Sequence, residues 1–187
     1  MFAHIRSDVL RFHRADTTPG IRAWLRLAGD NFGLQALFVY RFGRWLSRLR
    51  RHLPGWLVAA CLYPLYWLLA AFVRLAYGIR LEQSADIGPG FYIGHFGRIR
   101  VAHCQIGPRC AIQQHVSLGP EAGEPGPVIG AGVWIGAHVT ITAGVRIGDY
   151  ATIAAGAMVN QDIPPRCLVV GNPGRIVQRD YDNSAFL

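Results

Sequence analysis

The side chains best suited to acid–base chemistry in this sequence are four histidines between residues 81 and 177: His95, His103, His115 and His138. An imidazole titrates near neutral pH, so it can act as a general base on a substrate hydroxyl. His95 lies in Gly94-His95-Phe96-Gly97, where small neighbours leave room around the ring. His115 follows 20 residues later and is expected to stack roughly over His95. We predict His95 as the general base; the alternative is a solvated surface histidine.

Other chemistries find less support in the residues present. Three histidines at related spacings would suit a metal ion, but no HxH or HxxxH pair is present to anchor zinc. The sequence also lacks a GxSxG elbow, a Walker loop and a Rossmann glycine pattern. The four cysteines have no CxxC pairing and are expected to be buried, reduced thiols. We therefore predict that the chain has no metal site.

The element that must position these histidines is a six-residue repeat. Every sixth residue from Ile129 to Val159 is Ile or Val, and glycine directly follows three of them, at Gly130, Gly136 and Gly148. A period of six is neither the 3.6 of a helix nor the 2 of a strand. It is typical of a parallel β-helix, in which each hexapeptide forms one side of a prism. The glycines are expected to relieve the bends through positive φ angles.

The same spacing begins at Leu81 and continues to about Val170, which gives roughly five coils of 18 residues. We therefore assign residues 79–177 to a β-helix domain and residues 178–187 to a polar, mobile tail. The segment Gly119–Pro127 interrupts the repeat and is expected to loop out of the wall. Loops that project from a rigid scaffold often carry functional residues.

The N-terminal residues 1–78 differ from the β-helix in charge. The chain has a net charge of +8, and eleven of its 19 basic residues, all arginines, lie in residues 1–74 beside three acidic ones. Residues 1–17 are expected to be irregular, followed by a short helix at Gly20–Ala28 and an amphipathic helix at Leu34–Arg51. This basicity favours contact with an anionic surface. Nucleic acid is not predicted, because no reading helix or finger motif is present.

The segment Leu53–Val73 has no charged residue and is long enough to span a bilayer. Pro64 at its centre and its scattered aromatic residues favour two alternatives, an interfacial segment or a helix buried in an oligomer. We predict a possible peripheral membrane contact through residues 34–74. Because the first 20 residues are polar and contain no apolar secretory core, a cytoplasmic location is expected, including the inner face of the membrane.

Four motifs between Tyr77 and Val177 resemble the serine acetyltransferase-like branch of the hexapeptide acyltransferases: Ile87-Gly88-Pro89-Gly90-Phe91-Tyr92-Ile93-Gly94-His95, Ile112-Gln113-Gln114-His115-Val116-Ser117-Leu118-Gly119, Val128-Ile129-Gly130-Ala131-Gly132-Val133-Trp134-Ile135-Gly136-Ala137 and Val169-Val170-Gly171-Asn172-Pro173-Gly174-Arg175-Ile176-Val177. The resemblance implies a left-handed β-helix, a homotrimer and direct acetyl transfer, with His95 as the general base. It also implies that acetyl-CoA lies in a groove between coils, with cofactor-binding residues at Gly136, Ala137, Ala154, Ala155, Asn172, Pro173 and Arg175.

Three departures from the serine acetyltransferase pattern concern the acceptor. Gly94 stands where that pattern has Asp before the catalytic histidine, and Pro125-Gly126 stand where it has Arg-His. Arg80 stands where an upstream Asp would orient the histidine, which leaves Glu82 as a candidate for that role. We assign His115 and Glu82 to acceptor binding.

With the sequence Gly94-His95-Phe96-Gly97 and a basic, apolar N-terminal segment, the chain resembles acetyltransferases of capsule and exopolysaccharide assembly. The sequence therefore predicts an acetyl-CoA-dependent O-acetyltransferase that acts on a sugar hydroxyl, often carried on a lipid-linked glycan. The first alternative is a serine O-acetyltransferase of cysteine biosynthesis. Two further alternatives are a metal-dependent β-helix of the γ-carbonic-anhydrase kind and a catalytically silent β-helix that assembles at a membrane.

Overall fold

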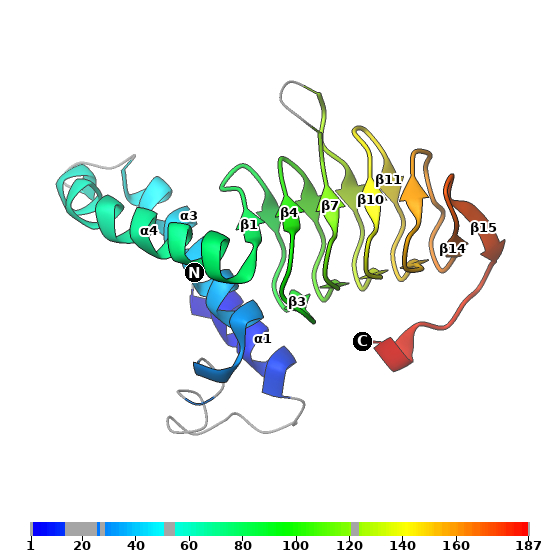
Figure 1. Ribbon diagram of the computed structural model, residues 1–187, viewed down its shortest axis with the longest axis horizontal. Helices are drawn as coiled ribbons and strands as arrows, with labels where there is room; N and C mark the ends of the chain where they lie inside the picture. The colour runs from blue at the N-terminus through cyan, green and yellow to red at the C-terminus, as the bar shows by residue number, and fades with distance from the viewer. Residues whose placement is uncertain (1, 14–25, 27–28, 51–54, 121–123, 187) are drawn as a thin grey trace.

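Helices gather at one end of the molecule and a β-helix forms the rest (Figure 1). The structure is a computed structural model that describes residues 2–13, 26, 29–50, 55–120 and 124–186. Its long helices are α1 (Phe2–His13), α3 (Phe32–Leu49) and α4 (Gly55–Tyr77). The predicted helix at Gly20–Ala28 falls outside the described residues, except for Arg26.

The β-helix has three sheets, and successive coils add one short strand to each. Sheet A has the order β1-β4-β7-β10-β13, sheet B the order β11-β8-β5-β2, and sheet C the order β15-β14-β12-β9-β6-β3. All described pairs are parallel except β14 with β15. The predicted left-handed β-helix of about five coils with N-terminal helices is confirmed. The strands are β1 (Ile79–Leu81), β2 (Asp86–Ile87), β3 (Tyr92–Ile93), β4 (Ile99–Val101), β5 (Gln105–Ile106), β6 (Ala111–Ile112), β7 (Ser117–Leu118), β8 (Val128–Ile129), β9 (Trp134–Ile135), β10 (Thr140–Ile141), β11 (Arg146–Ile147), β12 (Thr152–Ile153), β13 (Met158–Val159), β14 (Leu168–Val170) and β15 (Arg175–Gln178).

The repeated aliphatic residues fill the inside of the prism, as the six-residue period predicts. Full burial of one such side chain contributes about 1.5–3 kcal/mol, so the stacked column is the main source of stability. The buried members of the column are Ile87, Ile93, Ile99, Ile106, Ile112, Leu118, Ile129, Ile135, Ile141, Ile147, Ile153 and Val159.

The glycines that follow these aliphatic residues serve close approach between coils, which corrects the expected role in positive φ. A Cβ atom on Gly107 would lie 2.6 Å from the Gly130 carbonyl carbon of the next coil. Positive φ occurs elsewhere in the turns, at glycines and also at larger residues such as Arg109 and Tyr150. The repeat therefore needs glycine because adjacent backbones touch there, and no side chain fits between them.

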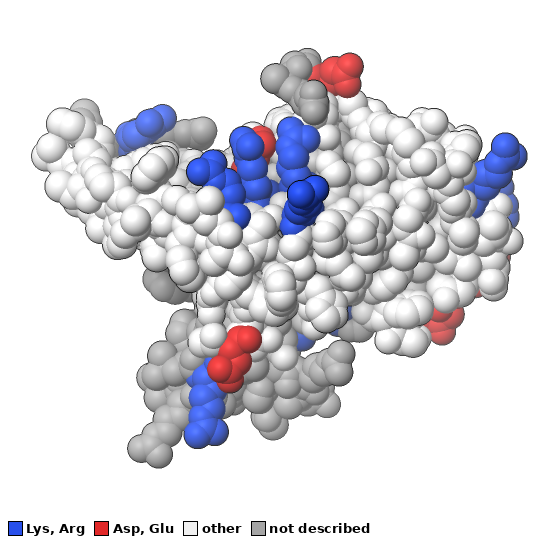
Figure 2. Space-filling view, in the orientation of Figure 1, with Lys and Arg blue, Asp and Glu red and all other residues white. Residues whose placement is uncertain are grey.

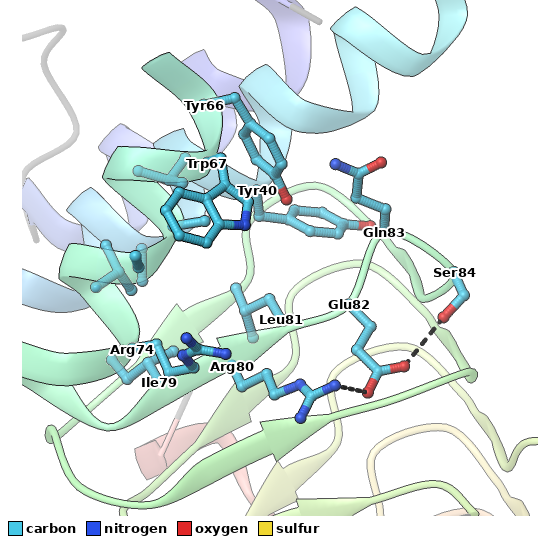
Figure 3. A pocket seen from close by; sticks show the side chains of 15 residues that line it. Tyr40, Tyr66, Trp67, Arg74, Ile79, Arg80, Leu81, Glu82, Gln83 and Ser84 are labelled. Atoms are coloured by element: carbon cyan, nitrogen blue, oxygen red, sulfur yellow. Dashed lines mark hydrogen bonds and ion pairs between the residues drawn. The ribbon is translucent and has the colours of Figure 1, made fainter. Parts of the chain in front are cut away.

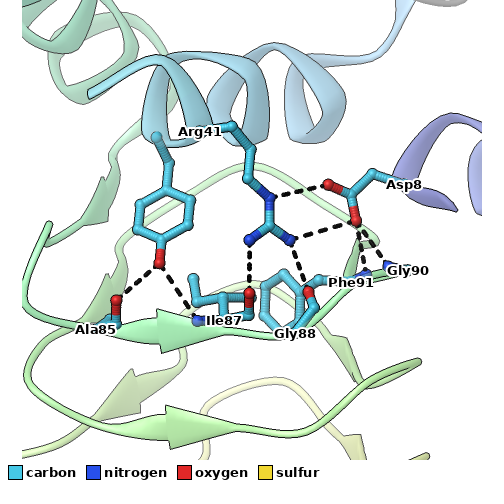
Figure 4. Close-up of polar contacts among 8 residues, drawn as sticks. Asp8, Arg41, Ala85, Ile87, Gly88, Gly90 and Phe91 are labelled. Carbon is cyan, nitrogen blue, oxygen red and sulfur yellow. Dashed lines mark hydrogen bonds and ion pairs between the residues drawn. The ribbon is translucent and has the colours of Figure 1, made fainter. Parts of the chain in front are cut away.

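A buried ion pair joins the N-terminal helices to the first coil (Figure 4). Arg41 of α3 donates from Nε to Asp8 of α1 at 3.1 Å, and from Nη1 and Nη2 to the carbonyls of Ile87 and Gly88 at 2.5 and 2.6 Å. Asp8 Oδ1 accepts from the Gly90 amide at 2.8 Å. The expectation of an irregular start is therefore wrong, because α1 is held in place by the buried carboxylate of Asp8.

The C-terminal tail also departs from expectation, because it folds back onto the β-helix. Asn183 is buried and donates from Nδ2 to the Gly132 carbonyl at 2.9 Å. The ring of Phe186, in the short helix η1 (Ser184–Phe186), lies 4.8 Å from the ring of Trp134. The prediction of a mobile tail is wrong for these residues, because one buried amide and one aromatic contact hold them.

Candidate active site

The candidate site is the edge of the prism where sheet C meets sheet A, here called the C–A edge. It is formed by the turns that follow β3, β6, β9, β12 and β14. Backbone hydrogen bonds stack these turns: the Gly94 amide donates to the Ile112 carbonyl at 2.9 Å, and the Gly136 amide to the Ile153 carbonyl at 2.8 Å. From the first turn to the last, four strand spacings make the edge about 19 Å long.

Sequence-predicted catalytic and cofactor residues come together on this edge. His95 lies exposed in the turn after β3, at the end of the edge nearest the helices. The predicted cofactor residues follow it coil by coil, so the predicted base and the predicted donor-binding residues lie on one continuous surface. These residues are Gly136 and Ala137 after β9, Ala154 and Ala155 after β12, Asn172 and Pro173 after β14, and Arg175 on β15.

Small residues keep this surface shallow. Gly136 is buried, and a Cβ atom there would lie 2.6 Å from the Ala155 amide nitrogen of the next coil. At Gly94 an added Cβ would overlap the amide group of Gln113, which lies directly over it. The contact involves only the end of the flexible Gln113 side chain, which can move, so it does not by itself require glycine at position 94.

His115 stacks over Gly97, which corrects the prediction that it stacks over His95. Its amide donates to the Gly97 carbonyl at 2.9 Å. Pairing of Ile93 with Ile112 and of Arg100 with Ser117 leaves two extra residues in the turn that carries His95. That turn therefore bulges. The spacing alone hid the bulge, because Val101 and Ile99 are both aliphatic and both fit the inward position.

The imidazole rings of His115 and His138 form a stacked pair along the C–A edge. Their centroids are 4.4 Å apart and their planes differ by 8°. Both residues adopt positive φ, 57° and 60°, at equivalent turn positions in successive coils. Within the described residues, no group of three His, Cys, Asp or Glu side chains is arranged to hold a metal.

The turn of His95 is supported from the helices. Phe96 contacts Phe32 of α3 edge-to-face, with centroids 5.2 Å apart, and Phe32 in turn lies 6.1 Å from Tyr77 at the end of α4. In the part of the chain that the structure describes, the His95 ring has no hydrogen-bond partner. The helices thus fix the position of the turn, and packing on Phe96 is the contact that sequence reasoning missed.

Glu82 does not orient His95 within one chain, so that prediction is wrong. Glu82 follows β1, and its amide donates to the Val101 carbonyl at 2.9 Å, at the far end of β4 from His95. Its carboxylate pairs with Arg80 at 3.4 Å and accepts from Ser84. Glu82 and His95 lie at opposite edges of sheet A, because Glu82 follows the sheet A strand β1 whereas His95 precedes the sheet A strand β4.

The interrupting segment also leaves from the other edge of sheet A. It follows β7 and projects from the wall, as predicted (Figure 1). Arg100 holds its base by donating to the Pro120 carbonyl at 3.0 Å, and Gly126 lies directly against the His103 carbonyl. His95 and this loop therefore do not share a site within a single chain.

Two cysteines of the β-helix are inert. Cys104 and Cys110 are buried, and burial raises the pKa of each thiol to about 12. Cys110 donates from Sγ to the Gly130 carbonyl at 3.0 Å. Cys167 is buried as well, so the prediction of buried thiols is confirmed for these three and is wrong for Cys61, which is exposed on α4.

Comparison with known proteins yields one consistent group. Residues 126–161 match the family described as bacterial transferase hexapeptide (six repeats). A serine acetyltransferase from Synechococcus elongatus is 32% identical over 183 residues, which cover 96% of this chain and 70% of that protein.

Two solved structures are similar along nearly the whole chain. A serine acetyltransferase in complex with CoA has a TM-score of 0.75 and 26% identity, covering 94% of this chain and 68% of that one. The serine acetyltransferase of Neisseria gonorrhoeae in complex with serine has a TM-score of 0.73 and 26% identity, covering 93% and 68%.

These similarities overturn the prediction of a sugar hydroxyl as acceptor. That prediction rested on the basic, apolar N-terminal segment and on three departures from the serine acetyltransferase pattern, at Gly94, Arg80 and Pro125-Gly126. The match to the Synechococcus elongatus enzyme covers 96% of this chain, so the N-terminal segment belongs to the same similarity and does not set the chain apart from serine acetyltransferases.

Proposed function

Because this chain belongs to the serine acetyltransferase-like branch of the hexapeptide-repeat transferases, we propose that it acetylates the hydroxyl of L-serine. It is an acyltransferase that uses acetyl-CoA as donor. The observation that carries the proposal is the C–A edge, where His95 and the predicted donor-binding residues lie in one line of stacked turns. The choice of serine rests on the relatives, which are serine acetyltransferases over most of this chain.

The donor is proposed to lie along the C–A edge with its thioester at His95. The small, half-buried Ala137 leaves room for the extended arm of the cofactor beside the buried Gly136, and Asn172 and Pro173 border the far end. Arg175 is exposed on β15, where its guanidinium suits a phosphate of the nucleotide. This placement puts the reactive end of the donor beside the general base.

The chemical step is proposed to be direct transfer. His95 takes the proton from the serine hydroxyl as that oxygen attacks the thioester carbonyl. Backbone N–H groups stabilise the oxyanion that forms. When it collapses, the C–S bond breaks, the thiolate of CoA leaves, and the imidazolium returns its proton to the sulfur. No covalent acyl-enzyme is required.

We propose that the active enzyme is a homotrimer and that the acceptor site is completed between subunits. His95 and the Gly119–Pro127 loop lie on opposite edges of sheet A in one chain, so a shared site requires a neighbouring copy. The acceptor-contact role proposed for His115 fits its position beside Gly97 on the turn of His95. Glu82 could contact only an acceptor bound at the His95 of a neighbouring copy.

The proposal is tested by measuring release of free CoA thiol with L-serine, N-acetylglucosamine or water as acceptor. Saturable release with L-serine, together with O-acetylserine in the mass spectrum, is the expected result. Release only with the sugar, or only hydrolysis, would exclude serine as the acceptor. Light scattering on the same preparation gives the oligomeric state, and a monomer with full activity would exclude the shared site.

We also propose that the enzyme works in the cytoplasm at a membrane surface. The helix α4 is long and apolar enough to cross a membrane by length and composition, with a mean hydropathy of 1.9, and only 11% of that stretch is buried. In the described residues the cysteines are free thiols, which suits a reducing compartment. Co-sedimentation with lipid vesicles tests the contact, and protein left wholly in the supernatant would contradict it.

A further inference from the structure

A cavity of about 420 Å³ lies between α4 and the first strand of sheet A (Figure 3). Its helix side is apolar and aromatic, with Tyr66 and Trp67 from α4 and Tyr40 from α3. Its strand side is polar and runs along Arg80–Ser84. One wall therefore suits hydrocarbon and the other suits a charged group. The cavity lies on sheet A beside the helices, apart from the cofactor residues of the C–A edge.

Across its helix and strand sides, the cavity is lined, among the described residues, by two guanidinium groups and one carboxylate. Arg74 and Arg80 line the cavity, and Arg80 lies in register with Arg100 on the neighbouring strand. Like charges at such a pair destabilise a sheet unless something neutralises them. Glu82 pairs with Arg80 at 3.4 Å and is the carboxylate that lines this cavity. In Figure 2 the basic side chains gather over β1 and β4, with little acidic surface among them.

An apolar strip leads from this cavity along the outside of α4. Trp67 lines the cavity and is nevertheless 69% exposed. Leu68 and Phe72 are more than half exposed, and Leu75 is 81% exposed. The helix carries no charged residue before Arg74. A basic cavity and an uncovered apolar strip thus form one continuous surface.

We infer that this surface is the binding site for an anionic phospholipid, which deepens and rests on the proposed membrane contact. The phosphate of the headgroup lies between the guanidiniums of Arg74 and Arg80, which are suited to phosphate oxygens. The acyl chains lie along Trp67, Leu68 and Phe72. The helix then lies in the plane of the interface, with its apolar side in the acyl boundary and with Arg74 and the neighbouring Arg80 at headgroup level.

The combination of charge and hydrocarbon favours a lipid over a soluble anion. A free phosphate would neutralise the arginines but leave the strip from Trp67 to Leu75 in water. A second copy that met this surface with its own α4 would cover the strip but would bring its own arginines to the same place. An anionic lipid satisfies both parts of the surface at once.

The test is flotation of the full-length protein with vesicles of phosphatidylglycerol or of phosphatidylcholine. We expect at least tenfold more bound protein on the anionic vesicles. The variant Arg74→Gln/Arg80→Gln is expected to lose about tenfold in binding to anionic vesicles. The matched control Arg146→Gln/Arg179→Gln removes two exposed arginines of the β-helix and its tail and is expected to bind as the parent does. CoA release with L-serine is measured for every variant to confirm that each is folded.

The outcomes separate the lipid site from the membrane contact on which it rests. Equal binding of the parent to both vesicle types, or parental binding by Arg74→Gln/Arg80→Gln, would overturn the lipid site and leave the membrane contact standing. Absence of the parent from both vesicle types would overturn both. If Leu68→Glu/Leu75→Glu breaks the oligomer while the parent ignores vesicles, the strip is covered by a second copy.

A soluble probe distinguishes a lipid from its phosphate. Titration calorimetry with dihexanoyl phosphatidylglycerol, below its micelle concentration, is expected to show binding that Arg74→Gln/Arg80→Gln weakens about tenfold. Inorganic phosphate is expected to compete only weakly, because it has no contact with Trp67. Equal affinity for inorganic phosphate and for the short-chain lipid would identify the site as one for a soluble anion and would overturn the inference.

Discussion

The β-helix and α4 are both rich in aliphatic residues, yet they place them in opposite environments. In the β-helix every member of the six-residue column from Ile87 to Val159 is buried against the coil above or below it. In α4, by contrast, Trp67 and Leu75 are 69% and 81% exposed. In a β-helix each coil packs against the coils next to it, whereas the outer face of α4 has no neighbouring element among the described residues of the single chain. Apolar composition alone therefore does not say whether a segment forms core or an interaction surface.

The contrast between the β-helix and α4 would fail most clearly if acetyl transfer did not depend on the C–A edge. We expect His95→Ala to lower kcat for acetyl transfer by about 10²–10⁴-fold, the usual loss when a general base is removed. His103→Ala is the matched control, because His103 is exposed on a different turn, and it should retain near-parental kcat. Steady-state CoA release measures both. A His95→Ala enzyme with parental kcat would place the base elsewhere.

The next largest effect is expected from breaking the buried ion pair that joins the helices to the β-helix. Asp8→Ala leaves the buried guanidinium of Arg41 without its carboxylate, and we expect a loss of about 3–5 kcal/mol in unfolding free energy. Asp86→Ala removes the partner of Arg44 from a pair in which the Asp86 side chain is 71% exposed, so about 0–1 kcal/mol is expected.

Urea unfolding monitored by circular dichroism compares these two variants. Limited proteolysis adds a local measure, since α1 should become the first cleavage site in Asp8→Ala. Equal stability losses in the two variants would show that burial does not distinguish the pairs, and that the helices are held by other contacts.

Within the β-helix, the glycine positions provide a smaller test. Gly107→Ala places a Cβ atom 2.6 Å from the next coil, and overpacking of this kind typically costs about 1–3 kcal/mol. Gly156→Ala meets nothing within 4 Å but has φ of +74°, so about 1–2 kcal/mol is expected from the backbone alone. Thermal unfolding ranks the two. A more stable Gly107→Ala would contradict close approach as the reason for glycine there.

Cysteine labelling measures the difference in exposure between α4 and the β-helix without a mutation. Cys61 on α4 is exposed, whereas the thiols of Cys104 and Cys110 have pKa values raised to about 12 by burial. At pH 8 only about one in 10⁴ of those thiols is the reactive thiolate. We expect iodoacetamide to modify Cys61 in the folded protein, and the others only after unfolding, as peptide mass spectrometry would show. Fast labelling of Cys104 in the folded state would mean that the coil opens.

Prediction from the sequence succeeded where the structure follows from a pattern among residues close together in the chain. The six-residue repeat from Ile129 to Val159 predicted the β-helix, which the structure confirms. The roles of His95, Asn172 and Pro173 stay predictions. Prediction failed where partners are distant in sequence. Asp8 is 33 residues from Arg41, and Asn183 is 51 residues from Gly132, so neither contact has a signature in its own neighbourhood.

The acceptor prediction failed for a related reason. Three departures from the family pattern, at Gly94, Arg80 and Pro125-Gly126, were interpreted one at a time, as missing contacts to serine. In the structure only Gly94 lies beside His95, whereas Arg80 lies on β1 and the loop leaves from the opposite edge of sheet A. The match to a serine acetyltransferase, which covers 96% of this chain at 32% identity, then outweighed the evidence from these single positions.

The sequence by itself determined the architecture, because a period of six leaves one way to bury an aliphatic residue every sixth position. It also indicated a candidate base, since His95 stands between Gly94 and Phe96-Gly97 in one of the motifs that carry the family resemblance. Only the tertiary structure decided which turns stack on one another, because two extra residues before β4 moved His115 to Gly97 and left His95 on a bulge. It likewise decided that α4 is exposed and beside a basic cavity, since exposure depends on which surfaces meet.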